Sequence, residues 1–92
     1  MAAQQEWYVY RAINNSRKEV YHGVTIEPLY RIIDHCLGKT KALKHWNCEK
    51  DDLLVKIISV HKSHQDASAI AHDLEKKYRS NKGYKNIRTA GK

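Results

Sequence analysis

The alternation of apolar and polar segments predicts the element order strand, strand, helix, strand, helix. Residues 7–13 and 19–25 are rich in the aromatic and β-branched residues that favour strands. Between them, residues 14–18 (Asn-Asn-Ser-Arg-Lys) carry side chains that bond to local backbone and favour a turn. We therefore expect these two strands to form a hairpin.

A helix is expected after the hairpin, ending at about residue 37. Its apolar residues recur at the i, i+3, i+4, i+7, i+8 spacing of an amphipathic helix. These residues are Leu29, Ile32, Ile33, Cys36 and Leu37. Thr25 is a suitable cap, Pro28 is tolerated in a first turn, and Gly38 suits a left-handed cap at the end.

The second half of the chain predicts a strand and a helix. Residues 53–60 are almost continuously apolar, which is typical of a strand covered by helices on both faces. A helix is expected from Asp66 to just before Asn81. Its apolar stripe consists of Ala67, Ile70, Ala71, Leu74 and Tyr78. The intervening residues 38–52 are irregular, and we expect Trp46 to pack on the core rather than to stack on a base.

These elements indicate an α+β fold with a small three-stranded antiparallel sheet flanked by helices. A chain of 92 residues can build one hydrophobic core, so residues 1–92 are expected to form a single domain. Residues 1–5 and about 84–92 are expected to be loosely ordered.

Charge is unevenly distributed along the chain. The net charge is +7, yet residues 1–75 contain ten basic and ten acidic residues, so the whole excess follows Glu75. A local basic field suits contacts with nucleic-acid phosphates, although a solvated chain end is an equally good interpretation of the charge alone. The candidate nucleic-acid contacts are Lys39, Lys41, Lys44, Lys76, Lys77, Arg79, Lys82 and Lys85.

Composition points to a cytoplasmic protein without a membrane segment. No stretch approaches the roughly 18 apolar residues of a membrane span, and no secretory signal is visible. Cys36 and Cys48 are therefore expected to be reduced. A structural zinc site that combines them with His35 and His45 is disfavoured, because adjacent residues of a helix point about 100° apart.

Three polar residues near the hairpin suggest phosphate chemistry. Tyr21 lies in the second strand, close to Gly23, which allows a close backbone approach. Arg31 and His35 are one helical turn apart and share a face. A guanidinium binds phosphate oxygens through a planar fork, and a tyrosine or histidine can move a proton.

At these residues the sequence resembles the GIY-YIG nuclease family. Tyr8-Val9-Tyr10 and Tyr21-His22-Gly23 are similar to the two signature triplets, with Tyr8 where glycine is usual and His22 where a small apolar residue is usual. Arg31 and His35 stand at the spacing of the family's arginine and histidine. The resemblance implies that Tyr21 assists proton transfer at the water, that Arg31 stabilises the phosphate, and that Tyr10 supports the site.

The resemblance also implies one divalent cation, usually Mg²⁺ and alternatively Mn²⁺, held by a glutamate near the start of the later helix. One alignment of that helix puts Asp66 at this position, and another puts Ile70 there and leaves no ligand. Three functions therefore remain: a metal-dependent DNA endonuclease, a catalytically idle nucleic-acid-binding module, and a protein-interaction domain. Taken singly, the tyrosines are ordinary strand residues and Arg31 is a partner for Glu27.

Overall fold

The structure is a computed structural model that describes residues 5–36, 43–79 and 82–87, without the side chains of residues 33 and 34. Several residues singled out above lie outside the described part. These are Leu37, Gly38, Lys39, Lys41 and Asn81, together with the side chain of Ile33.

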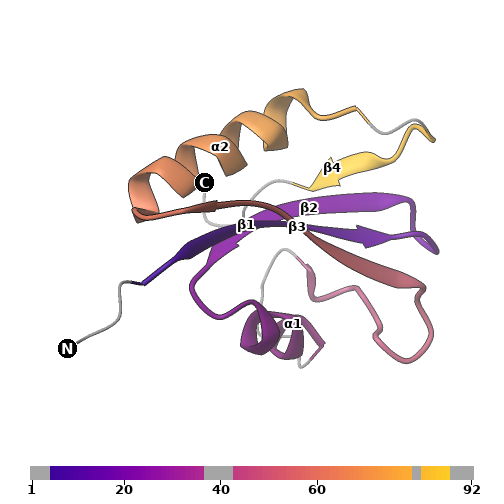
Figure 1. Cartoon of the computed structure of the whole chain (residues 1–92). Coiled ribbons are helices and arrows are strands. Elements are labelled where there is room, and N and C mark those ends of the chain that lie inside the picture. Colours follow the sequence, from indigo (N-terminus) through magenta and orange to yellow (C-terminus); the bar gives the residue numbers. More distant parts are fainter. Residues whose placement is uncertain (1–4, 37–42, 80–81, 88–92) are drawn as a thin grey trace.

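The described residues form one four-stranded mixed sheet and two helices (Figure 1). The elements are β1 (Trp7–Asn14), β2 (Glu19–Thr25), α1 (Pro28–Cys36), β3 (Leu53–His61), α2 (His64–Lys77) and β4 (Lys85–Ile87). The strand order is β3-β1-β2-β4. β1 is antiparallel to both β2 and β3, whereas β4 runs parallel to β2. The predicted α+β class and the hairpin are confirmed.

The prediction of three antiparallel strands is wrong, because β4 adds a fourth strand. It pairs with the start of β2 in the register Glu19↔Lys85, and the Lys85 amide donates to the Lys18 carbonyl at 2.9 Å. Residues 85–87 therefore belong to the sheet, where a loosely held segment was expected. A strand of three residues has no readable alternation, so its pairing with β2 is visible only in the tertiary structure.

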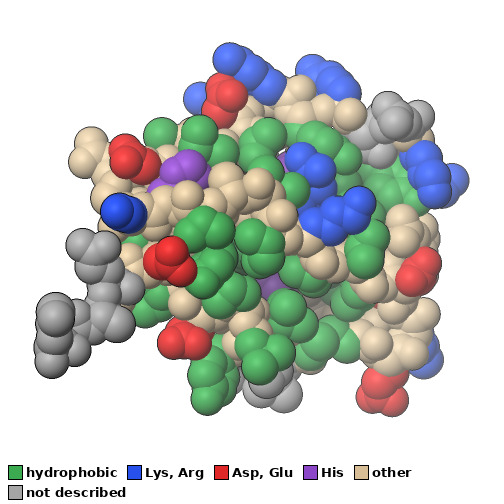
Figure 2. Space-filling model, in the orientation of Figure 1, with side chains coloured by type: hydrophobic (Ala, Val, Ile, Leu, Met, Phe, Trp, Pro, Cys, Tyr) green, Lys and Arg blue, Asp and Glu red, His purple; other side chains and the backbone are tan. Residues whose placement is uncertain are grey.

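The prediction that β3 is covered on both faces is also wrong. β3 is an edge strand, and Leu54, Ile57, Ile58 and Val60 are exposed. Figure 2 shows hydrophobic side chains across the middle of the face on which β3 lies. A continuous apolar run has the same sequence pattern whether helices cover the strand or not, so the pattern could not reveal the missing cover.

α1 turns a different face to the sheet from the one that its apolar stripe predicts, whereas α2 buries part of its predicted stripe. In α1, His35 is buried and Leu29 is 70% exposed, because these two residues point about 120° apart around a helix. In α2 the buried residues are Ala67, Ala71 and Glu75, and Ile70 is exposed. No helix in the described part of the chain combines the length and apolar character needed to cross a membrane.

Apolar clusters lie on both faces of the sheet. Tyr10, Ala12, Tyr21, Leu43 and Trp46 pack on the α1 side, and Val9, Ala67 and Ala71 pack under α2. The core position expected for Trp46 is confirmed, and its indole N–H donates to Glu19 Oε1 at 2.8 Å. Together the clusters fix β1 and β2, the strands that carry both triplets.

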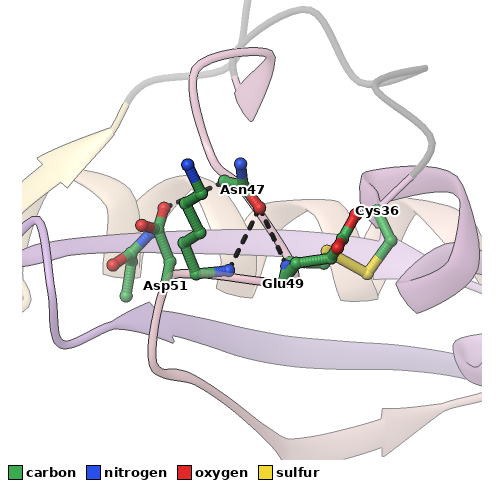
Figure 3. Close-up of a disulfide and its surroundings, with 7 residues drawn as sticks. Cys36, Asn47, Glu49 and Asp51 are labelled. Carbon is green, nitrogen blue, oxygen red and sulfur yellow. Dashed lines mark hydrogen bonds between the residues drawn. A yellow bond between two sulfur atoms is a disulfide. The ribbon is translucent and has the colours of Figure 1, made fainter.

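Cys36 and Cys48 form a disulfide, so the expectation of two reduced thiols is wrong. They are twelve positions apart in the sequence, yet their Cα atoms lie 5.4 Å apart, within the range that a disulfide spans. Figure 3 shows the bond joining the end of α1 to the turn at Asn47–Asp51. Cysteine count alone could not predict this contact, because it depends on which distant parts of the chain meet in the folded protein.

Candidate active site

A cavity of about 190 Å³ lies at the edge of the sheet where β2 continues beyond β4. β4 pairs with Glu19–Tyr21, and the cavity begins there and follows β2 to Val24. Side chains from α1 and α2, on opposite faces of the sheet, complete its wall (Figure 1). The lining residues are Tyr21, His22, Gly23, Val24, Arg31, Ser68, Ala71, His72 and Glu75.

Tyr21, Gly23 and Arg31 therefore lie together, as the sequence predicts. Arg31 reaches the cavity because α1 begins directly after β2, with the Thr25 hydroxyl accepting from the Glu27 amide at 3.0 Å. The Glu27 carbonyl then accepts from the Arg31 amide at 3.0 Å, which starts the helical hydrogen bonding. The local cap thus sets the position of Arg31 relative to the second triplet.

Tyr10 and His35 lie beside the cavity and support it. The Tyr10 hydroxyl and His35 Nε2 are 2.8 Å apart in a buried hydrogen bond, and the ring centroids of Tyr21 and His35 are 5.7 Å apart. Burial and the neighbouring Tyr21 raise the pKa of Tyr10 far above its ordinary value of 10.0, and the nearby Arg31 guanidinium only partly opposes this shift. Tyr10 therefore stays protonated at neutral pH and is a hydrogen-bonding support rather than a base.

Glu75 is a candidate site residue that the sequence patterns above did not single out. It is only 9% exposed and contributes to the cavity wall together with Tyr21 and Arg31. Its position four residues after Ala71, inside the predicted apolar stripe, was the available signal, because carboxylates are seldom buried without a role or a partner. A single charged residue on a buried helical face marks a candidate site even when a family alignment passes it over.

Asp66, the metal ligand suggested by one alignment, is not brought to this cavity. It is an exposed residue of the first turn of α2, and its amide donates to the Ser63 cap at 3.1 Å. Nine positions of helix separate it from Glu75, which corresponds to about 13 Å along the axis. Asp66 is thus explained as a helix-start residue favoured by the helix dipole.

β4 fastens the end of α2 on which Glu75 lies. The Asn86 amide donates to the backbone carbonyls of Glu75 at 3.3 Å and Tyr78 at 2.8 Å. Glu75 belongs to the last turn of the helix and Tyr78 is the capping residue after it, so partners for these carbonyls within the helix run out. Asn86 therefore positions the turn that presents Glu75.

His22, the departure in the second triplet, is a buried neutral imidazole. Arg11 Nε donates to His22 Nε2 at 2.9 Å, so the neutral ring carries its proton on Nδ1. Burial lowers the pKa of His22 to about 4, the Arg11 charge acts in the same direction, and Glu75 opposes it. The Arg11 guanidinium also stacks 4.0 Å from the Tyr78 ring centroid, so this group joins β1 and β2 to the end of α2.

The candidate nucleic-acid contacts that the structure describes lie in two places. Lys76, Lys77, Arg79, Lys82 and Lys85 follow Glu75 and are exposed around the end of α2 and the start of β4. Lys77 is engaged by Asp73 at 3.0 Å. Lys44 is exposed on the loop before β3. Lys76 and Arg79 line a neighbouring cavity together with Glu75, so part of the basic segment lies beside this residue.

Comparison with known proteins gives one match. A family model described as the GIY-YIG catalytic domain matches residues 6–87, which include both triplets and every described helix and strand. No curated protein and no solved structure shows significant similarity to the chain. The match extends over most of the sequence and agrees with the resemblance seen in the triplets. The chain therefore belongs to the GIY-YIG family.

Proposed function

We propose that this domain is an endonuclease that hydrolyses phosphodiester bonds in DNA with the help of Mg²⁺ or Mn²⁺. Membership of the family implies a nuclease-type function in general. The observation that carries the proposal is that β2, α1 and α2 contribute Tyr21, Arg31 and Glu75 to one cavity. A phenol, a guanidinium and a carboxylate are the groups that proton transfer, phosphate binding and cation binding require.

Glu75 fits the role of cation ligand better than Asp66. Its carboxylate belongs to a buried residue of the cavity wall. Mg²⁺ is commonly held by one or two carboxylates and keeps several waters, so a single glutamate suits it. The described residues contain no group of three or more potential ligands, which is the arrangement that an all-protein cage would need. When bound, the cation would supply stabilisation of negative charge on the phosphate.

The remaining steps are assigned to the chain's own side chains. Arg31 binds non-bridging phosphate oxygens and stabilises the charge that develops as the phosphorus becomes five-coordinate. The Tyr21 hydroxyl moves the proton of the attacking water at its oxygen. Tyr10 remains protonated. The rings of Tyr10, Tyr21 and His35 contact one another and form a ring cluster, which holds Tyr21 in place. Exposed lysines and arginines after Glu75 contact the phosphates that flank the scissile one.

A catalytically idle binding module would be favoured if no carboxylate lay near Tyr21 and Arg31. Glu75 lies on the wall of the same cavity and can supply that carboxylate. The basic segment is common to both functions and does not separate them. Cleavage is therefore the function favoured here.

Incubation of the purified protein with plasmid DNA and Mg²⁺ or Mn²⁺ tests the proposal. We expect nicking or linearisation that falls at least about 100-fold in Tyr21→Phe, Arg31→Ala and Glu75→Gln. Asp66→Asn is the matched control, since it removes an exposed carboxylate of the same helix, and it should retain activity. Cleavage that persists in Tyr21→Phe and Glu75→Gln would contradict the proposal, and loss in Asp66→Asn alone would return the metal to Asp66.

A further inference from the structure

The disulfide connects the helix of the candidate site to a fixed part of the fold. Cys36 is the last residue of α1 and directly follows His35, whose ring contacts Tyr10 and Tyr21. Cys48 lies in the turn at Asn47–Asp51. The bond therefore ends one residue away from a side chain of the ring cluster.

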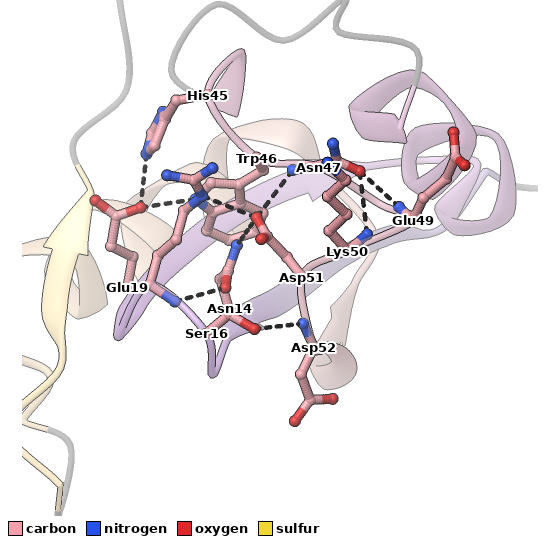
Figure 4. A network of polar contacts seen from close by, with 11 residues as sticks. Asn14, Ser16, Glu19, His45, Trp46, Asn47, Glu49, Lys50, Asp51 and Asp52 are labelled. Atoms are coloured by element: carbon pink, nitrogen blue, oxygen red, sulfur yellow. Dashed lines mark hydrogen bonds and ion pairs between the residues drawn. The ribbon is translucent and has the colours of Figure 1, made fainter.

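The turn that holds Cys48 is anchored to the sheet by a polar network. The Asn47 side chain accepts from the amides of Glu49 at 2.9 Å and Lys50 at 3.1 Å, as Figure 4 shows. The Asp51 carboxylate accepts from the Asn47 amide at 2.9 Å and from Asn14 Nδ2 at 2.9 Å. Because Asn14 is fully buried at the end of β1, the turn is fixed to the central strand of the sheet.

Few of the described side chains of α1 are buried. It contains nine residues, which is shorter than the roughly 12–15 residues that an isolated helix needs for marginal stability. Leu29 and Tyr30 are 70% and 65% exposed, so its first turn does not rest on the core. Among the described α1 residues, His35 is the one whose side chain is buried. His35 and Cys36, the last two residues of α1, attach the helix through a buried hydrogen bond and the disulfide, and Ile32 lines an apolar cavity with Trp46. The position of Arg31 therefore depends in part on that end of the helix.

We propose that Cys36 and Cys48 are positioning residues, and that the state of their disulfide controls how well α1 presents Arg31 and His35. The activity that it would control is the nuclease function proposed above, on which this inference rests. Cys36 is exposed, so a dithiol reductant can reach its sulfur. Exposed disulfides are commonly the labile or regulatory ones, which is the behaviour expected of this bond.

The chemistry of the switch is thiol–disulfide exchange. A thiolate of the reductant attacks the Cys36 sulfur, the S–S bond breaks, and the Cys48 thiolate leaves and takes a proton. The second thiol of the reductant then attacks the mixed disulfide and releases the Cys36 thiol. Two electrons and two protons pass to the protein, and the reductant becomes a cyclic disulfide.

The experiment compares the full chain before and after dithiothreitol. Alkylation of the native protein without reductant should modify no cysteine, and modification of both would overturn the proposal. Amide hydrogen exchange should then accelerate in α1 by on the order of tenfold after reduction, while β1 and β2 keep their protection. Unchanged protection of α1, or an equal loss over the whole sheet, would overturn a specific role in positioning the helix.

Cleavage kinetics provide the second readout. Reduction should lower kcat about tenfold or more with little change in KM, because Arg31 acts at the reacting phosphate and His35 supports the Tyr21 ring, while lysines elsewhere bind the DNA. The Cys36→Ser/Cys48→Ser double variant should match the reduced protein and should not respond to dithiothreitol. If oxidised protein does not cleave DNA, the proposed function fails, whereas the exchange measurement still decides whether the disulfide holds α1. Equal kcat in both redox states of a cleaving protein would overturn the proposal.

Discussion

The Tyr10 hydroxyl occupies the space that a Cβ would take on Gly23, which is the cross-strand partner of Tyr10 in the hairpin. A Cβ built on Gly23 would overlap the phenol oxygen, so only glycine leaves room for the buried hydrogen bond between Tyr10 and His35. The glycine that ends the second triplet is thus required by the tyrosine that ends the first.

Gly23→Ala is therefore expected to displace the Tyr10 ring, lower the free energy of unfolding by about 1–3 kcal/mol and abolish most cleavage. Denaturant unfolding and plasmid cleavage measure the two effects. Gly83→Ala is the control, because nothing lies near its Cβ and its φ of 75° leaves only a backbone penalty of about 1 kcal/mol. Full activity in Gly23→Ala would show that the close approach has no role in the site.

Tyr10→Phe removes a buried hydrogen bond while keeping the ring. Because His35 Nε2 then loses its partner, we expect the free energy of unfolding to fall by about 1–3 kcal/mol. Cleavage should decline less than in Tyr21→Phe, since the raised pKa of Tyr10 keeps it from acting as a base. A larger catalytic loss in Tyr10→Phe than in Tyr21→Phe would reverse the two assigned roles. Tyr8→Phe is the matched control, because the Tyr8 hydroxyl that it removes donates to Glu6 at the surface.

Acid should destabilise the fold through His22. Its pKa is about 4 in the folded chain and about 6.5 when unfolded, so the unfolded state binds the proton more tightly. The contribution of neutral His22 to the free energy of unfolding is therefore complete above pH 6.5. As the pH falls towards 4, this contribution is lost, and the free energy of unfolding decreases by about 3 kcal/mol in all. Unfolding free energies measured between pH 4 and 7 test this slope, which should flatten in His22→Leu. An unchanged slope in that variant would assign the acid sensitivity to other groups.

Asp51 makes the stability of the fold depend on pH in a second, more acidic range. Hydrogen bonds from the Asn47 amide, Asn14 and Arg17 lower the pKa of Asp51 to about 2 from 3.8. Stability that depends on this carboxylate is therefore present above pH 3.8 and lost as the pH falls through about 2. Asp51→Asn should lower the melting temperature at neutral pH and loosen the turn that carries Cys48. Asp52→Asn, one residue later and outside that set of bonds, should have the smaller effect.

Salt dependence tests the basic segment. Replacing Lys76 and Lys85 with glutamine should lower the slope of log affinity for duplex DNA against log salt by up to about 2, because each phosphate contact contributes about 0.9. Lys62→Gln changes the same type of charge at the other end of α2 and should leave the slope unaltered. Equal slopes for the wild type and the Lys76→Gln/Lys85→Gln variant would remove this segment from the DNA contact surface.

The amino-acid sequence by itself determined the hairpin, the approximate extent of both helices and the proximity of Tyr21, Gly23 and Arg31. These features are local: strand and turn propensities act over a few residues, and a helix that starts just after β2 must place Arg31 near its end. For the same reason, Arg31 and His35 were correctly assigned to one helical face.

Only the tertiary structure decided the features that join distant residues. Glu75 enters the cavity because α2 packs across β2 with its Ala67–Ala71–Glu75 face, a rotation that apolar spacing alone did not define. β4 exists because β2 offers it backbone partners, and the disulfide forms because the turn that carries Cys48 lies against the end of α1. Long-range pairing depends on which surfaces meet when the whole chain is compact, and no window of neighbouring residues contains that information.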